Sequence, residues 1–176
     1  MWLRALLVGL IALGGLFVVF NQSANAVNVI DPDKIEKIKN HCTENQATLN
    51  QLHQTDAFRR INRGELYRTI GDKLMVPLNR RLAASQLDAG SLLTITADYN
   101  NEYRVFFNAY IQYDNAMTKL LSVDCSKEPV TFYNALVEAR EKRGVLSKSN
   151  QTLQDFIRTY GTEFATFKAD YEANKQ

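Results

Sequence analysis

Residues 91–125 read SLLTITADYNNEYRVFFNAYIQYDNAMTKLLSVDC and carry the clearest helical pattern in the chain. Their apolar side chains recur every three or four residues, with one irregular step near Tyr103, and neither Pro nor Gly interrupts them. This spacing places the apolar side chains on one face of an α-helix. At 1.5 Å per residue the helix would be about 50 Å long, which predicts an elongated helical bundle. The apolar positions are Leu92, Ile95, Tyr99, Tyr103, Phe106, Tyr110, Tyr113, Met117 and Leu120.

The preceding segment, residues 31–86, also has helical spacing, but it contains interruptions. Asp31 is a suitable N-cap and Pro32 suits the first position of a helix. Pro77 is expected to kink the helix or to break it. Because the apolar stripe continues along the segment, with only Asn45 in one of its slots, one long helix with local irregularities is predicted. The stripe consists of Ile35, Ile38, Cys42, Leu49, Leu52, Phe58, Ile61, Leu66, Ile70, Leu74, Leu78 and Leu82.

The last segment, residues 129–175, keeps a heptad repeat for most of its length. Arg143 and Asn150 occupy two of the slots that an apolar residue would fill. The repeat keeps its phase across Gly144, which favours one long helix; Ser149 or Asn150 as an N-cap leaves a two-helix alternative open. The apolar positions are Phe132, Leu136, Ala139, Leu146, Leu153, Ile157, Tyr160, Phe164, Phe167 and Tyr171.

The two cysteines, Cys42 and Cys125, allow a single intramolecular disulfide. In an oxidising compartment an even number of cysteines favours a bridge, although two buried thiols are the alternative. The bridge would close a loop of about 84 residues and stabilise the fold by roughly 4–5 kcal/mol. The spacing matches neither a C-x-x-C redox pair nor a C-x-x-C-H haem site, so a structural bridge is predicted.

This disulfide also discriminates between bundle topologies. If the chain reversed at Gly64, Cys42 and Cys125 would lie at opposite ends of the bundle. Bridged cysteines have Cα atoms within about 7 Å of each other, so this topology excludes the bond. An all-α, antiparallel up-down bundle of about three long helices is therefore predicted, rather than one of four short helices.

The first two helices of this bundle differ in length. From Cys42 to Asp88 is 46 residues, whereas from Gly90 to Cys125 is 35. The excess corresponds to roughly 16 Å of helix and needs a local irregularity. We expect the first helix to be kinked or broken near residues 56–77.

The N-terminus has the composition of a signal peptide. Residues 5–20 are an unbroken apolar run after the positive charge of Arg4, and the run is followed by the small-residue triplet 24–26. Cleavage is expected after Ala26, which leaves residues 27–176 as a single helical domain. An uncleaved membrane anchor is the alternative. Both alternatives predict an exported protein, either periplasmic, extracellular or anchored to a membrane and facing outside.

The net charge of +2 is too small to predict a nucleic-acid partner. Membrane contact is expected only through residues 1–26, if these are not cleaved. The richest basic run is interpreted as a solvated helix face, with an anion site as the alternative. It comprises Arg59, Arg60, Arg63 and Arg68, together with the acidic Asp56 and Glu65.

No motif predicts catalysis, a cofactor or a metal site. His41 and His53 are the only histidines and lie twelve residues apart, which is not the spacing of a zinc or di-iron site. The nucleophile-elbow, Walker and dinucleotide-binding motifs are absent from the sequence. We therefore expect a protein that is not an enzyme. A carboxylate pair assembled in space is a remote alternative that sequence does not exclude.

The crowded aromatic residues of 99–113 and 156–171 are interpreted as core, with hydroxyl groups reaching the rim. Phe107 and Phe156 fall off the apolar stripes, so they are the candidates for an exposed contact surface. We expect a non-enzymatic interaction or scaffolding protein of the cell envelope or exterior, which binds an unidentified protein partner or itself. The alternative is a sensory or ligand-binding domain that holds a small molecule between helices near Tyr99–Tyr113.

Overall fold

The computed structural model describes residues 30–174, and within this range the chain is helical and contains no strand. This confirms the predicted all-α class. The expected signal peptide and the Ala26 cleavage site lie outside the described residues. The elements are α1 (Pro32–Asn40), α2 (Cys42–Thr69), the π-helical segment η1 (Ile70–Met75), α3 (Val76–Ala84), α4 (Gly90–Ser122) and α5 (Pro129–Ala173).

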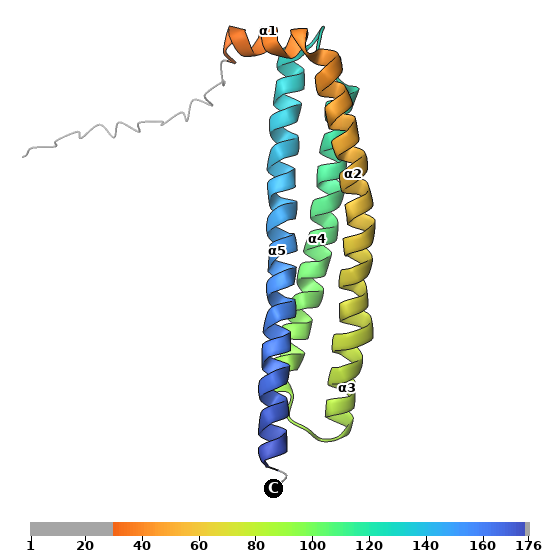
Figure 1. Ribbon diagram of the computed structural model, residues 1–176, viewed down its shortest axis with the longest axis vertical. Coiled ribbons are helices and arrows are strands. Elements are labelled where there is room, and N and C mark those ends of the chain that lie inside the picture. Colours follow the sequence, from red (N-terminus) through yellow and green to blue (C-terminus); the bar gives the residue numbers. More distant parts are fainter. Residues whose placement is uncertain (1–29, 175–176) are drawn as a thin grey trace, which may run out of the picture.

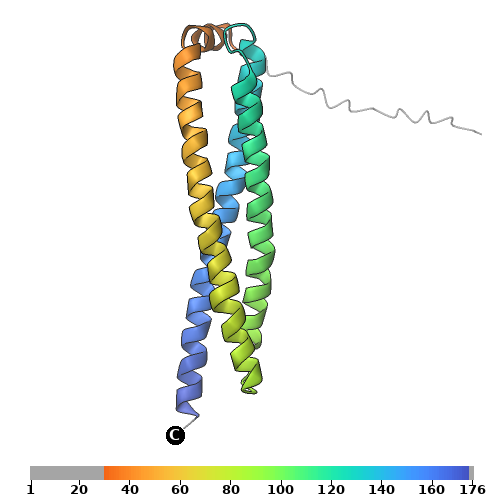
Figure 2. The same cartoon turned by 90° about the vertical axis from the view of Figure 1, so that its right-hand side faces the viewer.

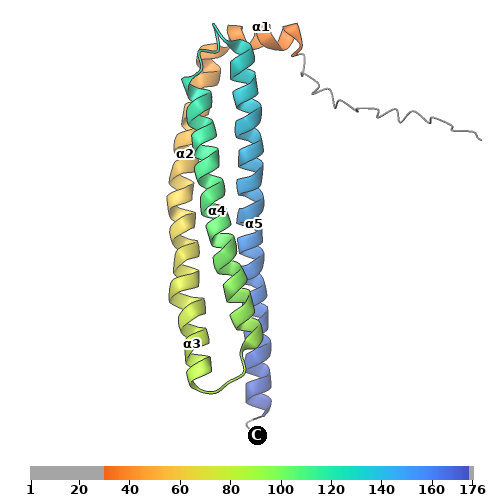
Figure 3. The ribbon, with the colours of Figure 1, turned by 180° about the vertical axis from the view of Figure 1, so that it is seen from behind.

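The helices from α2 onward form three long rods, and these rods run side by side (Figure 1). The first is formed by α2, η1 and α3 in succession, α4 returns antiparallel to it, and α5 runs antiparallel to α4 (Figures 1 and 3). α5 is a single helix of 45 residues, as the unbroken heptad phase predicted. None of the helices in the described part of the chain is both long and apolar enough to cross a membrane.

The first predicted helix is divided, which sequence did not indicate. α1 ends at Asn40, the backbone turns at His41 with φ −110° and ψ 21°, and α1 lies across the end of the bundle (Figure 1). The turn allows Ile38 to pack against the apolar cluster around the disulfide. A straight continuation of α2 would instead carry Ile38 beyond the end of the bundle, into solvent.

The predicted irregularity near residues 56–77 is a π-helical segment, η1, which ends just before Pro77. Pro77 does not break the rod, because it lies in the first turn of α3, where its missing N–H is tolerated. The three elements therefore follow one another as one continuous rod (Figure 2).

The core consists of two apolar clusters stacked along the bundle. The upper cluster surrounds Cys42 and Cys125, which are disulfide-bonded as predicted, with Cα atoms 5.5 Å apart. The lower cluster surrounds Tyr67 and Tyr99. Leu146 packs against both clusters and so marks the level at which they meet.

Candidate functional site

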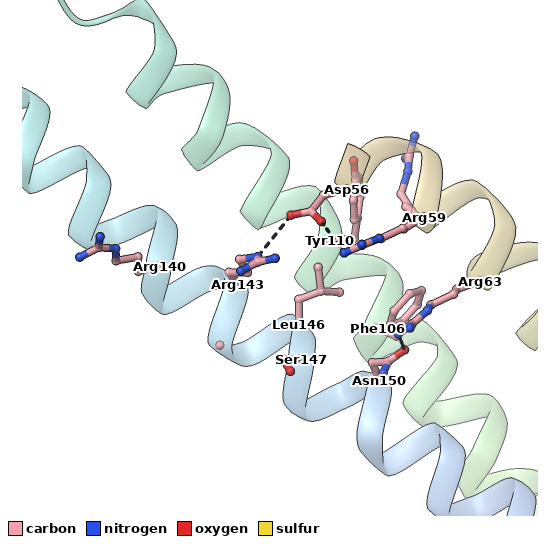
Figure 4. Close-up of a pocket in the computed structure, with 12 residues that line it drawn as sticks. Asp56, Arg59, Arg63, Phe106, Tyr110, Arg140, Arg143, Leu146, Ser147 and Asn150 are labelled. Atoms are coloured by element: carbon pink, nitrogen blue, oxygen red, sulfur yellow. Dashed lines mark hydrogen bonds and ion pairs between the residues drawn. The ribbon is translucent and has the colours of Figure 1, made fainter. Parts of the chain in front are cut away.

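A groove opens between α2 and α5 at the level where the two clusters meet, and α4 forms its floor (Figure 4). Its volume is about 520 Å³, within the range of about 300–1,000 Å³ typical of ligand sites. We call it the arginine groove. Its lining residues are Asp56, Arg59, Arg60, Arg63, Phe106, Tyr110, Arg140, Arg143, Gly144, Leu146, Ser147 and Asn150.

Five arginines from two helices converge on this groove. α2 contributes Arg59, Arg60 and Arg63, and α5 contributes Arg140 and Arg143 from the opposite wall (Figure 4). Arg63 follows the adjacent pair Arg59 and Arg60 by four and three residues, and Arg143 follows Arg140 by three. Residues at this spacing lie on the same face of a helix. Opposing walls of positive charge therefore face the same space.

Asp56 is the one acidic residue in the lining, and its charge is already engaged inside the protein. Its Oδ2 accepts a hydrogen bond of 2.7 Å from the Tyr113 hydroxyl and pairs with Nε of Arg143 at 3.2 Å, while Arg59 lies 3.8 Å from Oδ1. The Asp56 side chain is 11% exposed. Burial, and then the hydrogen bond to Asp56, raises the pKa of Tyr113, so this hydroxyl remains a donor.

The guanidinium of Arg60 lies over the floor of the groove. It sits 4.2 Å from the centre of the Tyr110 ring, and its Nε is buried without a hydrogen-bond partner. The Tyr110 hydroxyl donates to Asp114 at 3.2 Å, and Asp114 also contacts Nε2 of His53 at 2.8 Å. Burial, and then the charge of Asp114, raises the pKa of Tyr110. The ring beneath Arg60 is thus held in place.

Within residues 30–174, Arg63 and Arg140 form no ion pair with a carboxylate. Arg63 donates to Oδ1 of Asn150 at 2.8 Å, an atom that also accepts the Tyr67 hydroxyl at 2.7 Å. Arg140 has no ion pair or hydrogen bond with another side chain of residues 30–174. The groove therefore keeps an excess of positive charge after its internal contacts are satisfied.

This arrangement is suited to binding anionic groups. Guanidinium groups hold carboxylates and phosphates with paired hydrogen bonds, and several around one groove can hold more than one such group. Ser147 is the only hydroxyl nucleophile in the lining besides Tyr110, and no histidine lines the groove to activate it. Among the described residues, no three His, Cys, Asp or Glu side chains gather as metal ligands.

The structure divides the basic run that was interpreted as a solvated face. Arg59, Arg60 and Arg63 line the groove, whereas Arg68 forms an exposed pair with Glu65 at 2.8 Å. The interpretation is therefore confirmed for Arg59, Arg63 and Arg68, which are exposed, and wrong for Arg60, which is half-buried.

The same level of α2 also departs from the predicted apolar stripe. Phe58 and Ile61 are 67% and 61% exposed, and further along the rod Leu66 of α2 and Leu74 of η1 are exposed as well. Charged residues, not these apolar ones, face the neighbouring helices here. The reason is that Asp56 and Arg60 find polar and aromatic partners on α4 and α5 that sequence spacing does not reveal.

The two predicted contact residues differ from each other. Phe107 on α4 is exposed, as expected, with 47% of its surface accessible. Phe156 on α5 is half-buried and packs against the lower cluster, so the expectation of an exposed ring is wrong for it. Neither residue lines the arginine groove.

Most aromatic residues of α4 are core, as interpreted from sequence. Tyr99, Phe106, Tyr110 and Tyr113 are buried, whereas Tyr103 is half-buried and Phe107 is exposed. The hydroxyl groups of the three buried tyrosines bond within the protein; that of Tyr99, for example, donates to the Tyr67 carbonyl at 2.7 Å. Sequence indicated an anion site at Arg59, Arg60 and Arg63 only as the alternative, and it missed Arg140 and Arg143, because the groove depends on which helix faces which. Searches against protein-family models, curated proteins and solved structures find no match to this chain.

Proposed function

We propose that this protein is a non-enzymatic interaction protein of the cell envelope or exterior, which binds acidic groups of a partner in the arginine groove. The observation that carries the proposal is the charge of the groove: five arginines face one carboxylate, and Tyr113 and Arg143 already engage that carboxylate. Such a groove attracts and orients carboxylates or phosphates. A partner that supplies them relieves the repulsion among the arginines.

A second candidate function is the binding of a free small molecule with two or more acidic groups. The volume of the groove, about 520 Å³, favours it. The ligand would lie over Tyr110 and Phe106 rather than among the hydroxyls of Tyr99–Tyr113, because those hydroxyls are bonded within the protein. Both candidates need the same arginines and differ in the size of what they hold.

Arg140 is the best residue with which to test the groove, because it is exposed and its replacement breaks no hydrogen bond or ion pair within the described part of the chain. We expect the wild-type protein to bind inorganic tripolyphosphate, measured by isothermal titration calorimetry at low salt, and Arg140→Glu to weaken binding by about tenfold or more. Arg104→Glu makes the same charge change on the exposed face of α4, outside the groove, and should leave the affinity within about twofold. Equal losses in the two variants, or no binding by the wild type, contradict the proposal.

The export of the protein is part of the same proposal. It is supported by the signal-like residues 1–26 and by the Cys42–Cys125 disulfide, since such bonds persist in oxidising compartments. Trp2 is the only tryptophan, so cleavage after Ala26 removes it. We expect protein purified from the exported fraction of its native host to show no tryptophan fluorescence. A tryptophan emission band from that fraction would show an uncleaved leader.

A further inference from the structure

A second hollow continues the arginine groove toward the end of the bundle that α1 covers. Its volume is about 410 Å³. Arg140 lines both hollows, which makes them neighbours on the same pair of helices. The second hollow is lined by Lys34, Lys37, Ile38, Glu44, Asn45, Thr48, Leu49, Phe132, Tyr133, Leu136 and Arg140.

The two hollows follow one face of α5. The lining residues Tyr133, Leu136, Arg140, Arg143 and Ser147 are separated by three or four residues each. This is the spacing of a coiled-coil seam, in which one helix presents a continuous line of side chains to a neighbour. The lining of α5 extends from Phe132 to Asn150, which corresponds to about 27 Å of helix.

Apart from α1 at the end of the bundle, α5 has no closely packed neighbour along this seam within residues 30–174. α4 packs tightly on α5 and α2 packs on α4, but α2 and α5 have no comparable backbone approach to each other. At the level of the arginine groove they meet through long side chains instead, as in the contact between Arg143 and Asp56. A surface between two helices of a three-rod bundle, with the third as its floor, is where the last helix of a four-helix bundle lies.

The linings of the hollows combine charge with apolar surface. The second hollow has Lys34 and Lys37 beside half-buried Ile38 and Leu49, and the arginine groove has its five guanidiniums beside Phe106 and Leu146. Cations along the rim and apolar groups inside are complementary to an amphipathic helix whose polar face is acidic.

We propose that the two hollows together bind an acidic amphipathic helix of a partner protein, about 20 residues long, which completes a four-helix bundle. The proposal rests on the proposed function and names the class of partner. A flexible polyanion would use the cations but leave the apolar lining uncovered. A small anion would fill the arginine groove and leave Lys34 and Lys37 unused.

The test uses a labelled peptide of about 21 residues with Leu at the a and d positions of three heptads and Glu at most others. One control peptide has the same sequence except that two central residues are replaced by Pro, which prevents a continuous helix. A second control is poly-glutamate of the same length. Binding is measured by fluorescence anisotropy, and peptide helicity by circular dichroism of the mixture.

We expect the helical peptide to bind about tenfold more tightly than either control and to gain helicity when bound. Arg140→Glu, in both hollows, and the double variant Lys34→Glu/Lys37→Glu, in the second hollow alone, should each weaken it by about tenfold. Arg104→Glu should have no such effect. Thermal melts establish that each variant is folded.

Each failure has a distinct meaning. If poly-glutamate binds as tightly as the helical peptide, the helix is the wrong partner class. If tripolyphosphate binds in an Arg140-dependent way while Lys34→Glu/Lys37→Glu leaves peptide binding unchanged, the inference fails and the proposed function remains. If sedimentation shows a dimer that Arg140→Glu dissociates, the occupant is a second copy of this chain. If no anion binds, the inference and the proposed function both fail.

Discussion

Asp56 determines the character of the arginine groove at the scale of single residues. Without its carboxylate the five guanidiniums would face one another with no internal counter-charge, and two of them, Arg59 and Arg143, would lose an ion-pair partner. Tyr113 holds this carboxylate from the core side, through a hydrogen bond of 2.7 Å. Asp56 therefore links the packing of the upper cluster to the charge of the groove.

Tyr113→Phe tests this link. The substitution removes one hydroxyl whose acceptor is a nearly buried carboxylate, and hydrogen bonds to charged groups contribute about 1.5–3 kcal/mol each. We expect the free energy of unfolding, measured in urea, to fall by about that amount. Tyr133→Phe is the matched control, because Tyr133 makes no such bond within residues 30–174 and should change stability by less than about 0.5 kcal/mol. Equal losses in both variants would show that the Asp56 contact contributes nothing.

Part of the groove could be predicted from residues in sequence. Arg143 and Asn150 interrupt the heptads of α5, and a polar residue in an apolar slot indicates either a buried polar contact or a gap in the packing. The structure has both, since Arg143 meets Asp56 and Asn150 meets Arg63. Each pair is separated by 87 residues, so only the relative register of α2 and α5 brings them together. The spacing of residues along one helix does not predict how that helix is aligned against another.

At the scale of elements, sequence predicted the helices that depend on local pattern and failed where contacts decide. The unbroken phase of α5 and the Pro-free span of α4 are local properties, and both helices are present. The turn at His41 has no Pro or Gly to indicate it and arises because α1 packs across the bundle end. The outward position of Phe58 and Ile61 likewise follows from the partners of Asp56 and Arg60.

Two glycines of the first rod test how closely it packs. An added Cβ at Gly64 meets nothing within 4 Å, whereas at Gly71, in η1, it would lie 3.1 Å from Oδ1 of Asn100 and 3.2 Å from the buried ring of Tyr99. We expect Gly64→Ala to raise the free energy of unfolding by about 0.5–1 kcal/mol, through the higher helix propensity of alanine. Gly71→Ala should lower it, because the fully buried ring cannot move away without a cost of about 1–3 kcal/mol. Urea unfolding of both variants is the measurement, and a similar gain in each would show that η1 does not pack closely on α4.

At the scale of the whole molecule, the disulfide fixes one end of the bundle, beyond the arginine groove. It joins the first residue of α2 to the loop that leads into α5, at the end of the bundle where α1 lies. The lower cluster has no such link and depends on packing, together with hydrogen bonds such as that from Tyr160 to buried Asn79 at 2.9 Å. The two halves of the bundle should therefore respond differently to reducing agents.

We expect reduction to lower the free energy of unfolding by up to about 4–5 kcal/mol, because it frees a loop whose ends are 83 residues apart. The measurement is urea unfolding with and without dithiothreitol. The double variant Cys42→Ser/Cys125→Ser should behave like the reduced protein and should not respond further to the reagent.

Since the bond lies within the upper cluster, reduction should also act unevenly along the bundle. Amide hydrogen exchange under native conditions should accelerate most in α1 and the first turns of α2, and least around Tyr99 and Leu153 in the lower cluster. Uniform acceleration along the bundle would mean that the two clusters unfold as one cooperative unit, and unchanged stability would mean that the cross-link does not constrain the unfolded chain.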